Sequence, residues 1–187
     1  MTAPLKIAAS LARHCANSRV GLYIHVPFCE AICSYCNFTR GLFDAAPARR
    51  YVAAVVEEIR RASAPLSVDT IYFGGGTPSL LEPEEVTRII DVCRSSFCVS
   101  GKAEITMESN PESATKERLA GYRAAGVTRL SLGVQSFRDT ELVMLGRLHS
   151  SVAARRAFTF ARAVGFKDVS LDLMMWLPGQ KVLEWLE

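Results

Sequence analysis

The sequence predicts an α/β fold in which parallel strands alternate with helices. Five short β-type runs recur along the chain, each is followed by a turn signal, and helical periodicity separates them. Strands that alternate with helices in this way form a parallel sheet joined by right-handed crossovers. The expected strands are Gly21–Pro27, Thr70–Phe73, Glu104–Glu108, Arg129–Val134 and Val169–Leu177.

Four helices are expected between these strands. Arg50–Ser63 carries valine and isoleucine residues at helical spacing, and Pro83–Phe97 begins with a proline and two glutamates. Thr115–Ala125 is a third helix, and Val152–Val164 is a fourth that is followed by a glycine. One helix between each pair of strands is what parallel connections require.

The length of the chain limits which parallel architecture it can complete. A closed eightfold barrel takes about 250 residues, and 187 residues cannot supply it when strand starts lie about 25–50 residues apart. Periodicity alone fits a partial barrel and an open doubly wound sheet equally well. Either architecture places its functional groups on the loops that follow the carboxyl ends of the strands.

Composition excludes several classes of protein. Apolar residues make up 49% and charged residues 22% of the chain, the balance of a globular rather than a disordered protein. The net charge is only +3, and the arginine pairs lie on expected helices, so we expect no nucleic-acid partner. No apolar run approaches the roughly 20 residues of a membrane-spanning helix, so no spanning segment is expected.

The two ends of the sequence carry separate expectations. Residues 1–20 read as a basic extension without acidic residues, and residues 21–187 as an incomplete core domain. We expect a cytoplasmic protein, with a mitochondrial transit peptide and a matrix location as the alternative. At the other end, the apolar strand Val169–Leu177 is followed almost at once by Glu187. An uncovered apolar strand at a sheet edge favours aggregation, so we expect the chain to be part of a longer protein.

The most informative stretch is a cysteine cluster after the first expected strand. Cys29, Cys33 and Cys36 are separated by three and two residues, so their thiols can converge on one centre. Iron–sulfur clusters are held by cysteine thiolates, usually four, and three would leave one iron of a [4Fe–4S] cube open to a small molecule. A zinc site with His25 as fourth ligand, and buried or redox-active thiols, are the alternatives. The spacing favours the iron–sulfur cluster.

This Cys-x3-Cys-x2-Cys loop resembles the signature of the radical S-adenosylmethionine (SAM) superfamily. The resemblance implies a [4Fe–4S] cluster whose open iron is chelated by the amino and carboxylate groups of SAM. It also implies that one electron from the cluster cleaves SAM to a 5′-deoxyadenosyl radical. The implied fold is a partial (β/α)6 barrel, of which about five βα units can be found in this chain.

Six motifs resemble one branch of that superfamily, the oxygen-independent coproporphyrinogen III oxidases and HemW haem chaperones. They follow one another in the family's order from about residue 21 to the last residue. The motifs are Tyr23–Cys29 (YIHVPFC), Gly74–Pro78 (GGGTP), Glu108–Pro111 (ESNP), Gly133–Phe137 (GVQSF), Leu145–His149 (LGRLH) and Asp172–Gln180 (DLMMWLPGQ).

One position separates the two activities within this branch. The oxidase carries a fourth cysteine two positions after the third, whereas the HemW branch carries phenylalanine, as this chain does at Phe38. The resemblance therefore implies a haem chaperone that binds haem and passes it to an acceptor protein. The alternatives are the oxidase and a chain that is not functional by itself. The family's C-terminal domain, with its haem-associated His-Asn-x-x-Tyr-Trp stretch, does not occur in these 187 residues.

Nine residues are expected to bind SAM, seven of them implied by the same resemblance and two tyrosines because they flank the cysteine cluster. Each also has an ordinary structural explanation, such as a tight turn for the glycines, a solvated strand end, a surface charge or simple packing. No catalytic residue is assigned, and the electron donor and the haem acceptor are partners that the sequence does not identify. The expected SAM-binding residues are Tyr23, Tyr35, Gly75, Gly76, Thr77, Glu108, Gln135, Arg147 and Asp172.

Finer expectations concern the tyrosines, Asp172 and the histidines. Tyr35 is expected to stack on adenine, and Tyr23 to hydrogen-bond near the sulfonium end of SAM. Asp172 lies inside an apolar run, and because an unpaired buried carboxylate is costly, it needs ligand hydroxyls or Arg147 as a partner. The two histidines of the motifs, at positions 25 and 149, are expected to have structural roles rather than to bind haem.

Overall fold

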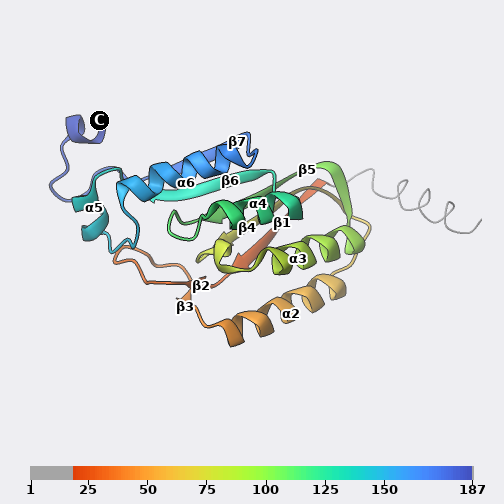
Figure 1. Ribbon diagram of the computed structural model, residues 1–187. Coiled ribbons are helices and arrows are strands. Elements are labelled where there is room, and N and C mark those ends of the chain that lie inside the picture. Colours follow the sequence, from red (N-terminus) through yellow and green to blue (C-terminus); the bar gives the residue numbers. More distant parts are fainter. Residues whose placement is uncertain (1–18, 187) are drawn as a thin grey trace, which may run out of the picture.

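The computed structural model describes residues 19–186, which form a curved main sheet covered by helices and a separate two-stranded sheet (Figure 1). Its elements alternate along the chain as the sequence predicts. They are β1 (Arg19–Val26), β2 (Phe28–Cys29), β3 (Gly41–Leu42), α2 (Ala45–Arg61), β4 (Ser67–Gly75), the 3₁₀ turn η1 (Pro78–Leu80), α3 (Pro83–Ser96), β5 (Cys98–Ser109), α4 (Lys116–Ala125), β6 (Arg129–Gln135), α5 (Asp139–Met144), α6 (Ser151–Ala163), β7 (Asp168–Leu173) and α7 (Val182–Leu186).

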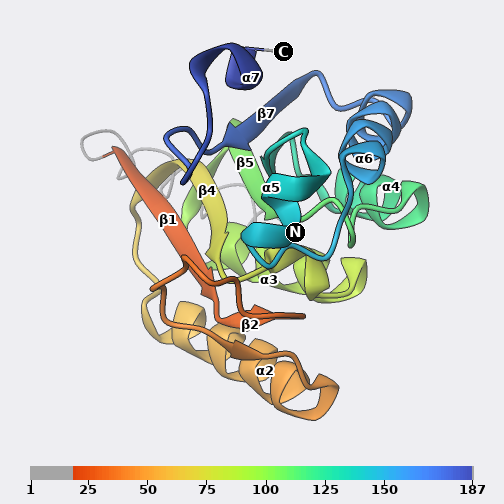
Figure 2. The same ribbon diagram turned by 90° about the vertical axis from the view of Figure 1, so that its left-hand side faces the viewer.

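The main sheet keeps its strands in sequence order, β1-β4-β5-β6-β7, and every neighbouring pair is parallel. A doubly wound sheet instead reverses its strand order at a switch point. Because every right-handed crossover here advances in the same direction, α2, α3, α4 and α6 lie on one face of the sheet (Figure 2). The strand order therefore decides between the two architectures that periodicity left open, and the fold is a partial barrel.

The two faces of the sheet differ in chemistry. The face that packs on the helices is apolar, and Phe73, Met107 and Leu132 are each 0% exposed. Burying such a side chain contributes about 1.5–3 kcal/mol, so this layer holds the fold together. On the alternate positions the register aligns polar residues instead, with Thr106 beside both Tyr72 and Arg129. The polar face is therefore available for a ligand.

Local signals in the sequence set the helix boundaries. The Asp44 side chain accepts from the Ala46 N–H, so α2 begins at Ala45 rather than at the expected Arg50. A capping box between Glu82 and Glu85 begins α3, and threonine and serine side chains cap α4 and α6. These caps satisfy N–H groups that the first turn of a helix leaves without partners.

The last strand is shorter than the sequence predicted. β7 ends at Leu173, whereas the expected strand continued to Leu177. The Met174 N–H still donates to the Gln135 carbonyl over 2.9 Å, but a turn through Gly179 with φ +78° follows. The prediction that Val169–Leu177 forms one strand is therefore wrong at its end. The turn residues Pro178 and Gly179 come only after the apolar run, so the sequence gives no earlier signal for the end of the strand.

None of the helices in the described part of the chain is long and apolar enough to cross a membrane. Most of the expected basic extension, residues 1–20, lies outside the described residues, and β1 already begins at Arg19.

Candidate cofactor site

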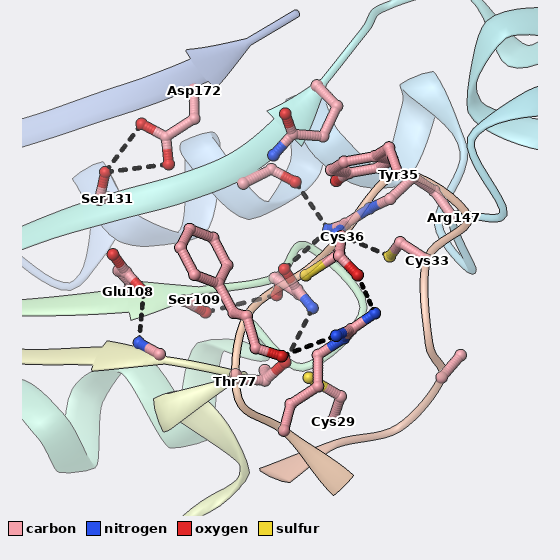
Figure 3. A pocket seen from close by; sticks show the side chains of 18 of the residues that line it. Cys29, Cys33, Tyr35, Cys36, Thr77, Glu108, Ser109, Ser131, Arg147 and Asp172 are labelled. Carbon is pink, nitrogen blue, oxygen red and sulfur yellow. Dashed lines mark hydrogen bonds between the residues drawn. The ribbon is translucent and has the colours of Figure 1, made fainter. Parts of the chain in front are cut away.

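A cavity of about 350 Å³ opens at the carboxyl ends of the strands, where this fold class places its functional groups. In the view of Figure 3, thiols lie toward one side of the cavity and carboxylates toward the other. All the site residues expected from the sequence, except Tyr23, lie on its wall. They are Cys29, Cys33, Tyr35, Cys36, Gly75, Gly76, Thr77, Glu108, Gln135, Arg147 and Asp172.

The cysteine loop is held at both ends by the short β2–β3 pair. The Gly41 N–H donates to the Pro27 carbonyl and the Phe43 N–H to the Cys29 carbonyl, each over 2.8 Å. These bonds bring residues twelve or more apart in the sequence beside each other. The loop between β2 and β3 is therefore closed at its base, and its cysteines line the same cavity as Cys29.

The three thiols share this cavity but differ in burial. Cys29 is buried, whereas Cys33 and Cys36 are half-buried. Burial raises the pKa of the Cys29 thiol, although the Thr77 hydrogen bond and the charge of Arg40 act in the opposite direction. A positive group on the cavity wall would therefore be needed to favour the thiolate form that binds metal.

The glycines after β4 permit close packing against the cysteine loop. A Cβ at Gly76 would lie 2.6 Å from the Phe28 carbonyl oxygen and 3.0 Å from the Cys29 Sγ. Gly75 has φ +117°, and a Cβ there would meet the His25 ring at 2.7 Å. Only glycine fits these positions without a shift of the backbone.

Glu108 is fixed at the end of β5 with its carboxylate in the cavity wall. Its Oε1 accepts from the Tyr72 hydroxyl over 2.8 Å, and its Oε2 accepts from the Gly75 N–H over 3.1 Å. Burial raises the pKa of Glu108 even though these hydrogen bonds favour the charged form. A carboxylate held in this way can accept a further bond from a ligand amine or hydroxyl.

Asn110 and Arg147 connect the loops after three strands. The Asn110 Nδ2 donates to the Thr77 Oγ1 over 3.1 Å, and the Arg147 Nη2 donates to the Asn110 Oδ1 over 2.7 Å. Arg147 also donates to the Gly133 carbonyl over 2.8 Å and to the Cys33 Sγ over 3.5 Å. Its buried Nε has no hydrogen-bond partner among the described residues. The guanidinium thus retains a donor for a ligand in the cavity.

Asp172 corrects one expectation. It lies on the edge strand β7 and is exposed rather than buried. Its partner within the chain is not Arg147, because the Ser131 hydroxyl donates to its Oδ1 over 3.0 Å and to its Oδ2 over 3.2 Å. A bond to ligand hydroxyls stays a prediction. Ser131 is opposite Ser170 in the β6–β7 register, which places it beside residue 172. The carboxylate still lines the cavity.

Gln135 ends β6 in an unusual backbone conformation. Its φ is +68°, in the left-handed region that side-chain-bearing residues rarely adopt. Such strain persists only where the surrounding structure enforces it, and it is concentrated at functional sites. Gln135 lines the cavity, as the sequence predicted.

The two expected tyrosines lie in different environments. Tyr35 lies on the cavity wall, and burial raises the pKa of its hydroxyl despite the nearby Arg147 charge. Tyr23 is 59% exposed and stacks on Tyr72, with ring centroids 5.9 Å apart. The structure therefore does not bring Tyr23 to the cavity wall, and its contact with SAM stays a prediction.

Both motif histidines have protein partners. The His25 Nε2 lies 3.0 Å from the Thr39 carbonyl oxygen, at the far end of the cysteine loop. His149 is buried between the Glu112 carboxylate and the Val134 carbonyl, each 3.0 Å from a ring nitrogen. These contacts agree with structural roles.

Sequence reasoning did not assign every wall residue, and four of the unassigned ones matter for the geometry of the site. They are Arg40, Asn110, Ser131 and Met174. Asn110 follows Glu108 at a strand end, which was a usable signal for a site residue. The sequence around Arg40, Ser131 and Met174 carries no such signal. These residues reach the cavity only through closure of the cysteine loop and the register of β6 with β7.

The wall fits an iron–sulfur cluster with a small polar ligand. All three converging ligand candidates are sulfur atoms, the donor type that such clusters use. Within the part of the chain that the structure describes, the buried Nε atoms of Arg40 and Arg147 have no partner, so each can donate to an anionic group. Among residues 19–186, no three His, Cys, Asp or Glu side chains are arranged to hold a single metal ion.

Comparisons with known proteins agree with this chemistry. Residues 23–187 match the family model described as the Radical SAM superfamily. The mouse (Mus musculus) protein named "Radical S-adenosyl methionine domain-containing protein 1, mitochondrial" is 41% identical, over 92% of this chain and 40% of its own length. "Heme chaperone HemW" of Bacillus subtilis is 39% identical, over 84% of this chain and 43% of its own length.

A solved structure gives the same assignment at the level of the fold. Coproporphyrinogen III oxidase (HemN) from Escherichia coli, described as a radical SAM enzyme, superposes with a TM-score of 0.84 and 28% identity. The match covers 97% of this chain and 43% of that one. The chain therefore spans about two-fifths of the length of the relatives it matches.

Proposed function

The chain belongs to the radical SAM superfamily, and from this membership we propose that it is the cluster- and SAM-binding core of a HemW-like haem chaperone. Membership implies a [4Fe–4S] cluster and SAM as cofactors. In the proposed site Cys29, Cys33 and Cys36 hold the cluster. When bound, the cluster supplies one open iron for SAM and one electron for its cleavage.

The wall residues divide the binding of SAM between two sides of the cavity. Arg147 offers its free Nε to a carboxylate, next to Cys33, with which it is already in contact. Glu108 and Asp172 offer acceptors to hydroxyl or amino groups on the other side. Tyr35 presents an aromatic ring on which a purine can stack. In this proposal the charged end of SAM lies nearest the thiols.

A single residue carries the choice of chaperone over oxidase. Phe38 lines the cavity two positions after Cys36, where the oxidase pattern has a fourth cysteine. The side chain is 68% exposed, so nothing in its packing demands phenylalanine. The relatives named heme chaperone HemW support the same choice. The oxidase is the second candidate because the HemN structure superposes on nearly the whole chain.

The two candidates are separated by their reactions with tetrapyrroles. We expect the anaerobically reconstituted protein to change its absorbance on addition of haem and to leave coproporphyrinogen III unchanged. Release of 5′-deoxyadenosine would be measured with and without coproporphyrinogen III. Formation of protoporphyrinogen IX would overturn the chaperone proposal, and so would the lack of any haem-dependent absorbance change.

The compartment and the partners belong to the same proposal. We propose a reducing compartment, the cytoplasm or the mitochondrial matrix, because three cluster thiols must remain reduced. The mouse, cow and zebrafish relatives carry the word mitochondrial in their names, whereas the bacterial HemW names do not. Fractionation of cells that express the tagged protein tests the location. An electron donor and a haem acceptor complete the proposed set of partners.

A further inference from the structure

Arg40 closes the cysteine loop on itself. Its Nη1 donates to the Phe38 carbonyl over 2.7 Å, and its Nη2 donates to the Cys36 carbonyl. Its Nε is buried and has no partner among the described residues. The side chain also lines the cavity. Two carbonyl bonds thus fix a guanidinium beside the last of the three cysteines, and the Nε–H is among the donors that remain.

The charge of Arg40 is not neutralised by a carboxylate. None of the ion pairs within residues 19–186 includes it. Arg40 and Arg147 are the two cationic residues on the cavity wall. Arg147 has the charge of Glu112 nearby, so among the described residues Arg40 is the wall cation without a carboxylate counterpart.

The cysteine side of the cavity is where that charge acts. The Nη2 bond to the Cys36 carbonyl holds the guanidinium beside the cysteines that line the same cavity. A fixed cation favours negative charge that is added in its neighbourhood. Reduction of a thiolate-bound cluster adds one electron and hence one negative charge. Net charge, hydrogen bonds and exposure are the protein's means of setting the potential of such a cluster.

We propose that Arg40 is a positioning residue that holds the Cys36–Phe38 segment and, through its charge, raises the reduction potential of the cluster. The inference rests on the cluster of the proposed function. The electron comes from an external reductant and is taken up by the cluster. Arg40 itself undergoes no chemical change.

The test is a potentiometric titration of the reconstituted full chain with dithionite, followed by electron paramagnetic resonance. In Arg40→Gln the charge is lost, and we expect the reduction equilibrium to shift about tenfold toward the oxidised cluster, which is about 59 mV for one electron. Arg40→Lys keeps the charge and is expected to restore most of the shift. Arg61→Gln removes an exposed charge from α2, 78% exposed at its side chain, and is expected to match the wild type.

Each outcome decides a different point. An unchanged potential in Arg40→Gln with full iron content would overturn the proposal, as would equal shifts in Arg40→Gln and Arg61→Gln. If Arg40→Gln and Arg40→Lys both lose iron, the residue acts on loop shape alone and the electrostatic assignment is wrong. Loss of iron in Arg40→Gln alone, with retention in Arg40→Lys, supports it. A wild-type protein that binds no cluster would refute the proposed function instead, so the two failures are distinguishable.

Discussion

Two arginines in different regions of the molecule show how a structural site differs from a ligand site. Arg118 lies behind η1, where its Nη1 bonds both Glu82 carboxylate oxygens at 3.0 Å. Its Nη2 donates to the Ser79 and Leu81 carbonyls, and its Nε donates to the Tyr122 hydroxyl over 3.2 Å. Every nitrogen of this guanidinium therefore has a protein partner.

Arg147, at the cavity, differs in one respect. Its two Nη atoms bond Asn110, the Gly133 carbonyl and Cys33, but its buried Nε bonds none of the described residues. Buried donors are nearly always satisfied in folded proteins. We therefore expect substitutions around Arg118 to alter stability, and substitutions at the cavity to alter what the protein binds.

The largest expected effect contrasts two cysteines. Cys33→Ala removes one of three proposed cluster ligands, so bound iron and sulfide should fall to near zero after anaerobic reconstitution. Cys93→Ala is the matched control, because Cys93 is 0% exposed in the core and away from the cavity wall. It should keep its iron and lose roughly 1 kcal/mol of unfolding free energy through the small void. Equal iron content in the two variants would contradict the assignment of Cys33 as a cluster ligand.

The same pair differs in reactivity. Burial raises the pKa of the Cys93 thiol to about 11, so at neutral pH it should resist alkylation in the folded protein. Mass spectrometry after iodoacetamide treatment of the cluster-free chain should find label on Cys33 well before Cys93. Faster labelling of Cys93 would contradict the packing described for α3.

The second effect concerns Tyr122, which bonds the same two carbonyls as Arg118. Tyr122 is 0% exposed, and its hydroxyl donates to the Ser79 and Leu81 carbonyls over 2.8 Å. Tyr122→Phe should lower the free energy of unfolding by about 1–2 kcal/mol, with Arg118 still serving both carbonyls. Urea denaturation measures this loss, and the iron content should stay at the wild-type value. A loss of iron without a loss of stability would contradict the structural role assigned to Tyr122 and Arg118.

The third effect concerns the Asn110 bridge. Asn110→Leu removes one of the acceptors of Arg147 and the amide donor to the Thr77 hydroxyl. We expect SAM affinity to fall about tenfold, near 1.4 kcal/mol, when titrated by the change in the cluster's spectrum. Asn110→Asp keeps an acceptor for Arg147 and should bind SAM more tightly than the leucine variant. Identical affinities in all three proteins would remove the bridge from the binding site.

The smallest effect depends on pH. Burial raises the pKa of Glu112, but hydrogen bonding from His149 and the charge of Arg147 outweigh it, so the pKa lies below its usual value of 4.5. A carboxylate with a depressed folded-state pKa stabilises the fold above the unfolded value and loses that contribution as pH falls below it. The difference in unfolding free energy between wild type and Glu112→Gln should therefore shrink below pH 4.5. A difference that grows on acidification would contradict this sign.

Much of the fold follows from local patterns. The middle of each main strand and three of the four expected helix starts lie close to their expected places, because periodicity, caps and prolines act over a few residues. The order of the strands does not follow from such patterns, since it depends on how crossovers advance around the sheet. The short elements β2, β3, α5 and α7 lack enough residues to show a period.

The site divides in the same way. The spacing of the three cysteines predicts the cluster ligands, and their neighbourhood suggests the two tyrosines. The other assigned residues follow from the motif resemblance. What could not be foreseen is pairing across the fold, such as Ser131 with Asp172 or Asn110 with both Thr77 and Arg147. The role of Arg40 also depends on a loop that closes only in three dimensions.

The central claim is that three thiols hold a cluster with one iron left for SAM. Electron paramagnetic resonance of the anaerobically reconstituted, reduced protein with and without SAM tests it most directly. We predict a [4Fe–4S] signal whose g values shift when SAM is added, and no such signal in Cys33→Ala. A wild-type spectrum that SAM leaves unchanged would contradict the claim.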